Sequence, residues 1–258
     1  MKTVFQPLYD HLKPTLKRLL NKASFWLNHS MSHQSVVKRY LHGSGIEVGA
    51  LHNPLQVPPA VNVKYVDRLS VADLRKQYPE LAQEKLVNVD IVDDGEELHS
   101  IADHSQDFVI AHQFIEHCQN PIRAIENMLR VLKPDGILYL SIPDKRHNFD
   151  AHRPVTDIQH LLKDYKEGPE WSRYDHYQEW ATFVNLGYTE PPDPTADPRI
   201  AAETDRLMQM DYSIHFHVWT QTEVFELLPI LQKTLNFPFE VEVFLKNFGE
   251  VILVLRKL

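Results

Sequence analysis

The chain has 258 residues, of which 43% are apolar, a length and composition that can bury a full core within one domain. Its single cysteine, Cys118, excludes an internal disulfide and any zinc site built from several cysteines; we expect it to be a small residue on a helix face. No apolar run approaches the ~20 residues that span a bilayer, and the first residues lack the apolar core of a secretory signal. We therefore expect a cytoplasmic protein.

The net charge of −8 is unevenly distributed. Residues 1–45 carry seven lysines and arginines against Asp10 alone, so the remaining chain carries −14. The negative charge of the rest of the chain argues against nucleic acid as a partner, because affinity for nucleic acid comes largely from cations that contact phosphates. Residues 1–43 are expected to form a helical extension. Its stretch from Leu12 to Leu27 mixes apolar residues with cations, which favours a helix packed on its own domain and leaves peripheral membrane contact as the alternative.

Residues 44–54 combine a short apolar run with an acid and a glycine, Glu47 and Gly49, as a nucleotide-binding turn requires. A second apolar run, residues 63–67, ends in Asp67, 20 residues after Glu47. In a Rossmann-like site the backbone passes close to the ligand at the glycine, and the acid accepts from the ribose hydroxyls. The further glycines of G-x-G-x-x-G are missing. A pyrophosphate would therefore fit poorly, whereas a nucleoside without phosphates, such as S-adenosylmethionine, needs less room.

Short apolar runs typical of strands alternate with helical segments. This alternation predicts an α/β fold, in which a parallel sheet is wrapped by helices. The expected strands are 46–49, 63–67, 86–90, 107–111 and 137–142. Asn120 is a good N-cap and Pro121 suits the first helical position, so a helix with an apolar stripe should extend to Leu132. Ligands bind such sheets at the carboxyl ends of the strands.

Two segments carry a resemblance to a known family. Both closely resemble the central block of class I S-adenosylmethionine-dependent methyltransferases, in particular those similar to methyltransferase type 11. The segments are residues 105–117, S-Q-D-F-V-I-A-H-Q-F-I-E-H, and residues 130–143, R-V-L-K-P-D-G-I-L-Y-L-S-I-P. Asp135 replaces the first glycine of that block's K-P-G-G turn. The resemblance covers about residues 44–144 and, more loosely, 220–258. It implies a Rossmann-like methyltransferase domain over 44–258 and S-adenosylmethionine as the cofactor.

The resemblance also implies the cofactor-binding residues. Asp67 should accept from both ribose hydroxyls, and the acid after the third strand should accept from the adenine amino group; this acid is Asp94, with Asp93 as the alternative. Glu116 and His117 are expected to open the next helix. The complete expected set, at the carboxyl ends of the predicted strands, is Glu47, Gly49, Ala50, Asp67, Asp93, Asp94, His112 and Gln113.

A long insert, residues 145–219, separates the fifth strand from the helix opened by the capping-box pattern Thr220-Gln-Thr-Glu223. Residues 170–186 are predicted to be helical, and residues 188–198, with four prolines, to form an exposed loop. The alternation in residues 211–219 would put His215 and His217 on one side of a strand. We expect the insert to cap the carboxyl edge of the sheet and to form the acceptor pocket.

Methyl transfer asks mainly for alignment of the acceptor with the methyl group and for exclusion of water. A hydroxyl acceptor also needs a base within reach of its proton. The candidates are His147, Asp150, His176, His215 and His217. His176 is the first choice, because neighbouring aromatic residues on its helix could hold the ring. The residues expected to bind the acceptor are Arg146, Arg153, Arg173 and Tyr177.

A divalent metal held by His215 and His217 with Asp144 or Asp150 is an alternative way to acidify a sugar hydroxyl. Because His-x-His recurs by chance among 15 histidines, we assign no metal ligand. The leading hypothesis is methyl transfer to a small polar acceptor, a hydroxyl of a sugar, glycan or natural-product intermediate. Two alternatives stay open: a methyltransferase-like protein that binds the cofactor or a glycan without methyl transfer, and a Rossmann-like enzyme that uses another nucleotide.

Overall fold

The protein is represented by a computed structural model, which describes residues 33–193 and 196–258. The expected helix from Leu12 to Leu27 lies outside these residues, and of the N-terminal extension only residues 33–43 are described, of which 33–40 are helical. Within the described ranges, no helix is long and apolar enough to cross a membrane.

In the described part of the chain, seven strands form one sheet in the order β3-β2-β1-β4-β5-β7-β6. Strands β1 to β5 are parallel, and β7 is antiparallel to both of its neighbours. The order begins like the 3-2-1-4-5 of dinucleotide-binding sheets and then departs from it, because β7 lies between β5 and β6. The strands are β1 Ser44–Val48, β2 Asn62–Asp67, β3 Ile91–Val92, β4 Gln106–His112, β5 Leu132–Pro143, β6 Phe239–Asn247 and β7 Glu250–Lys257.

Four of the five predicted strands are confirmed as β1, β2, β4 and β5. The prediction of a strand over 86–90 is wrong. That segment bonds to two different partners: the amide of Val87 donates to Leu51 O at 2.8 Å, and the amide of Asp90 donates to Tyr65 O at 2.9 Å. Only Asp90 of this segment bonds to β2; regular pairing with β2 covers Ile91 and Val92, so β3 is two residues long.

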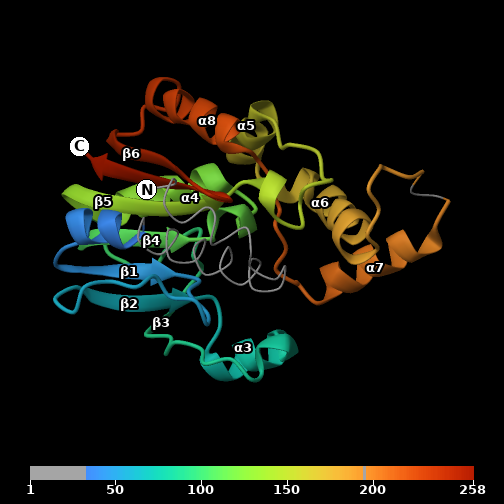
Figure 1. Ribbon diagram of the computed structural model, residues 1–258, viewed down its shortest axis with the longest axis horizontal. Coiled ribbons are helices and arrows are strands. Elements are labelled where there is room, and N and C mark those ends of the chain that lie inside the picture. Colours follow the sequence, from blue (N-terminus) through green and yellow to red (C-terminus); the bar gives the residue numbers. More distant parts are fainter. Residues whose placement is uncertain (1–32, 194–195) are drawn as a thin grey trace, which may run out of the picture.

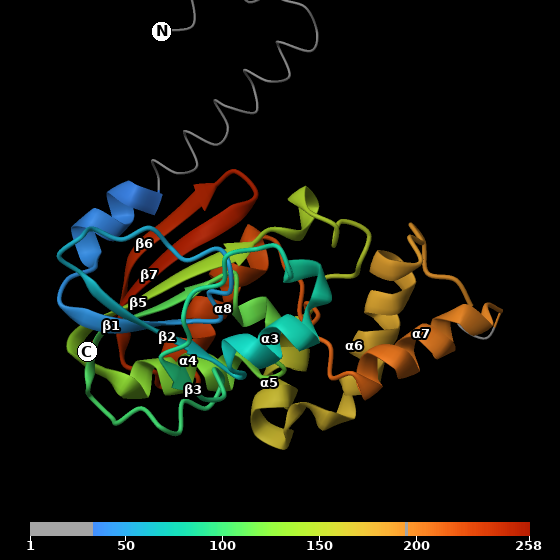
Figure 2. The ribbon, with the colours of Figure 1, turned by 90° about the horizontal axis from the view of Figure 1, so that it is seen from below.

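Helices cover both faces of the sheet (Figures 1 and 2). One face packs against α4 Pro121–Val131, α5 Ile158–Glu167 and α8 Gln221–Lys233, and the other against residues 33–41. The predicted caps are confirmed: the Asn120 side chain accepts from the Arg123 amide at 3.0 Å, and Thr220 and Glu223 form a capping box at the start of α8.

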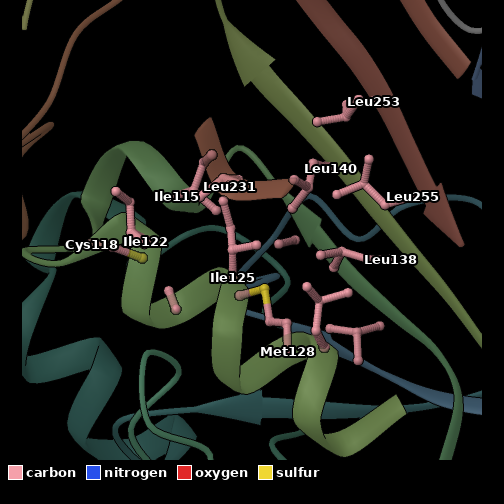
Figure 3. Packing of buried hydrophobic residues seen from close by; sticks show 14 of the residues in the cluster. Ile115, Cys118, Ile122, Ile125, Met128, Leu138, Leu140, Leu231, Leu253 and Leu255 are labelled. Carbon is pink, nitrogen blue, oxygen red and sulfur yellow. The ribbon is translucent and has the colours of Figure 1, made fainter. Parts of the chain in front are cut away.

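The apolar stripe of α4 fills the core on its side of the sheet. Figure 3 shows Ile125 and Met128 facing Leu138 on β5, and all three are almost fully buried. Burying each such side chain contributes roughly 1.5–3 kcal/mol to folding. Cys118 lies in the same core, at the end of the short helix η2 Ile115–His117 and not on a longer helix face.

The insert extends beyond the carboxyl ends of β1 and β4 (Figure 1). Its elements are η3 Lys145–His147, α5, η4 Pro169–Trp171, α6 Arg173–Trp180, a π-helical turn Ala181–Asn185 and α7 Pro198–Gln209. The predicted helix over 170–186 is therefore present, divided into these shorter pieces. Tyr177 and Trp180 pack against Leu207 and Phe216, which gives the insert a small core of its own.

The predicted strand over 211–219 is wrong. The segment is extended but pairs with no strand, because the amides of Phe216 and His217 both approach Glu116 O, at 2.8 and 3.3 Å. These bonds attach the end of the insert to the turn that follows β4. The remaining helices, α3 Val71–Gln77 and η1 Pro79–Leu81, follow β2.

Candidate functional site

A cavity of about 410 Å³ lies at the carboxyl ends of β1, β2 and β4, between these strands and the insert. Its volume falls within the roughly 300–1,000 Å³ typical of small-molecule sites. Residues from both halves of the chain line it. From the sheet side come Gly49, Asp67, Arg68, Tyr78, Asp94, Gly95, Gln113, Phe114 and His117, and from the insert Tyr177, Asp211, Tyr212, Ser213 and Phe216.

Two carboxylates face the cavity from neighbouring loops. Asp67 ends β2 and is only 9% exposed, so burial raises the pKa of its carboxyl. Asp94 lies two residues after the end of β3 and lines the same cavity. Asp93 does not line it, because its Oδ2 accepts from the amide and the hydroxyl of Ser100, at 2.7 and 2.6 Å. Of the two alternatives for the acid after the third strand, Asp94 is the one placed at the cavity.

Glycines keep this side of the cavity open. Gly49 has a φ of +67°, and a Cβ there would lie 2.7 Å from the ring of Phe114. A Cβ on Gly95 would lie 2.6 Å from the same ring. With two carboxylates for hydroxyl and amino groups, the lining suits an adenosyl group. Arg68 is already paired with Asp211 at 2.7 Å, so it is not poised to bind a phosphate.

Of the remaining predicted cofactor-binding residues, one lines the cavity and three do not. Gln113 lines the cavity, and its Nε2 donates to Ser141 Oγ at 2.9 Å. Glu47 and Ala50 are buried without lining it; Glu47 Oε1 accepts from the Leu55 amide at 2.8 Å and so closes the turn after β1. His112 lies against the ring of His33, 5.2 Å between centroids, on the side of the N-terminal helix.

None of the five candidate bases lines the cavity, which is a correction to their expected position. His176 and His217 lie together in a buried cluster of the insert, and His147 ends η3. His215 and Asp150 form a buried pair, Nδ1 to Oδ2 at 2.7 Å. This pair does not line the cavity itself. The His215 ring packs edge-on against the ring of His117, which does line it, with 4.6 Å between the centroids.

Two histidines line the cavity: His52, from the turn after β1, and His117, which was predicted only to open the next helix. His117 Nδ1 lies 2.9 Å from Ile214 O and 3.1 Å from Ser213 Oγ. Burial lowers the pKa of His117 to about 3, so the ring is neutral at pH 7. The Glu-His motif was the signal that could have identified it. Arg68, Tyr78 and Tyr212 carried no such signal, because folding of separate loops brings them together.

The four predicted acceptor-binding residues lie at different distances from the cavity. Tyr177 lines the cavity, and Arg173 reaches its edge through Asp211, Nη2 to Oδ1 at 2.7 Å. Arg153 does not, because it is fully buried and bonds to Asp150 at 2.7 Å and Glu179 at 2.8 Å. It therefore holds the insert together. Arg146, away from the cavity, pairs with the carboxylate of Asp144.

Comparisons with known proteins agree with this geometry. Residues 47–140 match the sequence model of a methyltransferase domain, whereas no curated protein matches the chain. A solved structure described as a candidate zinc-dependent alcohol dehydrogenase from Rhodobacter sphaeroides is 16% identical, with 86% of this chain and 87% of that one covered at a TM-score of 0.52. This likeness concerns the fold alone.

Two further solved structures are methyltransferases by their descriptions. The one from Aquifex aeolicus is 13% identical, with 87% of this chain and 88% of that one covered and a TM-score of 0.45. The one from Methanosarcina mazei is 18% identical, with 86% and 97% covered and a TM-score of 0.42. The segment matched by the domain model contains Gly49, Asp67 and Asp94. Residues 47–140 thus contain a methyltransferase domain, consistent with the class I S-adenosylmethionine-dependent superfamily, and this domain implies S-adenosylmethionine as the cofactor.

Proposed function

We propose that this methyltransferase acts on a hydroxyl of a small polar acceptor, such as a sugar, a glycan or a natural-product intermediate. The observation that carries the proposal is the two-sided cavity: carboxylates and glycines on the sheet side face tyrosines and hydrogen-bonding groups from the insert. Tyr78, Tyr177 and Tyr212 contribute ring surface, and their hydroxyls bond to Arg68, Tyr212 O and Glu80. Ring surface beside a few polar groups such as Ser213 Oγ suits a small polar ligand.

On the sheet side, the residues would hold the cofactor as follows. Asp67 would accept from the ribose hydroxyls and Asp94 from the adenine amino group, with Gln113 beside the methionine part. Gly49 and Gly95 leave the Phe114 ring in place and the cavity open beside it. When bound, S-adenosylmethionine supplies a methyl group attached to a positively charged sulfur.

On the acceptor side, the turn 210–212 closes the cavity against the segment after β2. Arg68 donates to Asp211, Gln77 Nε2 donates to Met210 O at 2.8 Å, and the Tyr212 hydroxyl donates to Glu80 Oε1 at 2.8 Å. These bonds join the insert to the sheet side of the cavity, whose residues would hold the cofactor. They would restrict the acceptor to a few orientations and exclude water, which is most of what a methyl transfer needs.

His117 is the residue best placed to orient the acceptor hydroxyl. If its Nδ1 donates to Ile214 O, its Nε2 is left as an acceptor for the hydrogen bond of a hydroxyl group. Because burial lowers the pKa of His117 to about 3, the ring would orient the acceptor hydroxyl without holding its proton at pH 7. The ring of His215, which bonds to Asp150, packs edge-on against the His117 ring. The proton of the hydroxyl would leave to solvent as the methyl group is transferred.

The test is transfer of labelled methyl from S-adenosylmethionine to a panel of hydroxyl acceptors, including free sugars and nucleotide sugars, with mass spectrometry to locate the methyl group. We expect an O-methylated product and a single-turnover rate about 10²-fold lower in His117→Ala, because the hydroxyl loses its orientation. His99→Ala, at an exposed position, is the control and should keep the rate. Binding of S-adenosylhomocysteine without transfer to any acceptor would instead favour a cofactor-binding protein.

A further inference from the structure

Three histidines and one aspartate form a cluster in the insert, separate from the lining of the cavity. His160 and Asp164 lie one turn apart on α5, His176 lies on α6, and His217 lies in the extended segment 211–219. One nitrogen or oxygen from each of the four side chains lies within 4.8 Å of the other three. Asp164 and His217 are fully buried, and His176 is 8% exposed.

The distances in this cluster match the spacing of ligands around a tetrahedral ion. His160 Nε2 lies 3.0 Å from His176 Nε2 and 3.3 Å from Asp164 Oδ2. His217 Nε2 lies 3.2 Å from Gln119 O, to which it must donate, so Nδ1 is the His217 atom that is left to bind an ion. Zinc bonds of about 2.0–2.1 Å in a tetrahedron separate neighbouring ligand atoms by roughly 3.3 Å. The side chains therefore need little movement to share one ion.

Two buried atoms of the cluster have no hydrogen-bond partner: Asp164 Oδ2 and His217 Nδ1. Leaving such atoms unpaired in the interior is costly. The other oxygen of Asp164 is well satisfied, because Oδ1 accepts from Trp171 Nε1 at 2.9 Å. That bond fixes the carboxylate with Oδ2 toward the histidines, as outer hydrogen bonds commonly do for a ligating carboxylate.

We propose that His160, Asp164, His176 and His217 bind a zinc ion that joins α5, α6 and the segment 211–219. Imidazole and carboxylate ligands suit zinc, and four protein ligands leave no open position, so the ion has a structural role. Burial lowers the pKa of His176 to about 3 and that of His217 well below its usual value, so both rings are neutral, the form that binds a metal.

The ion would also support the acceptor side of the cavity. Tyr177 follows His176 on α6, and Phe216 precedes His217, and both neighbours line the cavity. The metal set differs from the His215 and His217 pair considered from the sequence. His215 belongs instead to a second group of convergent side chains, with Glu116 and His117. An experiment must therefore distinguish the two groups.

The full chain, produced without a histidine tag, is analysed for bound metal and, after exchange, for its cobalt spectrum. We expect a single zinc ion per chain, an intense visible band from tetrahedral Co²⁺, and a lower melting temperature after chelation. Asp164→Asn and His176→Ala should lose the ion, whereas His215→Ala and the exposed control His99→Ala should keep it.

The wild-type measurements stand even if a variant fails to fold. Substoichiometric zinc together with no tetrahedral cobalt band would overturn the proposal. So would loss of the ion in His215→Ala with retention in His176→Ala, because the metal would then belong to the group beside the cavity.

Discussion

Arg68 and Asp211 form an ion pair, Nη1 to Oδ2 at 2.7 Å, that joins the end of β2 to the insert at the lining of the cavity. Arg173 donates to the other oxygen of Asp211, also at 2.7 Å. The Asp211 carboxylate thus links the end of β2 to α6. The Arg68 and Asp211 side chains are 37% and 57% exposed, so the pair should contribute only about 0–1 kcal/mol to stability.

We therefore expect Asp211→Ala to change acceptor binding more than stability. Its free energy of unfolding should fall by no more than about 1 kcal/mol, while the acceptor KM rises because the turn 210–212 loses its anchor. High salt should raise the wild-type KM in the same direction by screening the pair. Denaturant unfolding and steady-state kinetics measure both quantities, with the exposed Asp205→Ala on α7 as the control. An unchanged KM in Asp211→Ala would show that the pair does not shape the acceptor site.

Asp67→Ala and Asp94→Ala should each weaken binding of S-adenosylhomocysteine by about 1–3 kcal/mol, because hydroxyl or amino donors lose their acceptor. Asp93→Ala should behave differently. Its Oδ2 holds Ser100, so the variant should lose stability while affinity changes little. Titration calorimetry at one pH compares all three with Glu240→Ala on the exposed edge of the sheet. Equal losses in Asp93→Ala and Asp94→Ala would contradict the assignment of Asp94 alone to the cavity.

The parts of the fold that were predictable are those specified by local pattern. The stripe of α4, its Asn120 cap and the capping box at Thr220 depend on residues a few positions apart, and all three are present in the structure. β3 was misplaced because its pairing covers two residues, too few to leave a pattern in the sequence.

The candidate site was predictable only on the sheet side. Gly49, Asp67 and Asp94 follow strands whose carboxyl ends must meet, so their positions follow from the topology. Which of the predicted histidines line the cavity depends on how the insert packs: His176 is buried away from it, whereas His117, in the turn after β4, lines it. Composition and spacing in the insert do not encode that choice.

Gly49→Ala and Gly187→Ala form a pair that separates backbone strain from lack of space. Both glycines have positive φ, +67° and +72°, so either alanine should cost about 1–2 kcal/mol in strain. A Cβ at position 187 meets nothing within 4 Å, whereas at position 49 it meets Phe114 at 2.7 Å. Only Gly49→Ala should therefore also weaken S-adenosylhomocysteine binding. Equal binding by both variants would mean that Phe114 moves aside without disturbing the site.

Glu47 should make the protein less stable as pH rises. It is fully buried, and burial raises the pKa of its carboxyl from 4.5 to about 8, although the Leu55 amide acts in the opposite direction. The folded state therefore retains a proton that the unfolded state releases. The contribution to stability is fully present below about pH 4.5 and is lost, at about 1.4 kcal/mol per pH unit, as pH rises to about 8.

Glu47→Gln removes this titration and keeps an acceptor for the Leu55 amide. Its free energy of unfolding relative to wild type should increase steadily between about pH 5 and pH 8, as measured by denaturant unfolding at several pH values. Other groups with shifted pKa values, such as Glu96 and His117, titrate alike in both proteins, so their effects cancel in the difference. The exposed Glu240→Gln should give a difference that does not vary with pH. A constant difference for Glu47→Gln as well would mean that the buried carboxyl ionises at its ordinary pH, with its charge stabilised in the turn after β1.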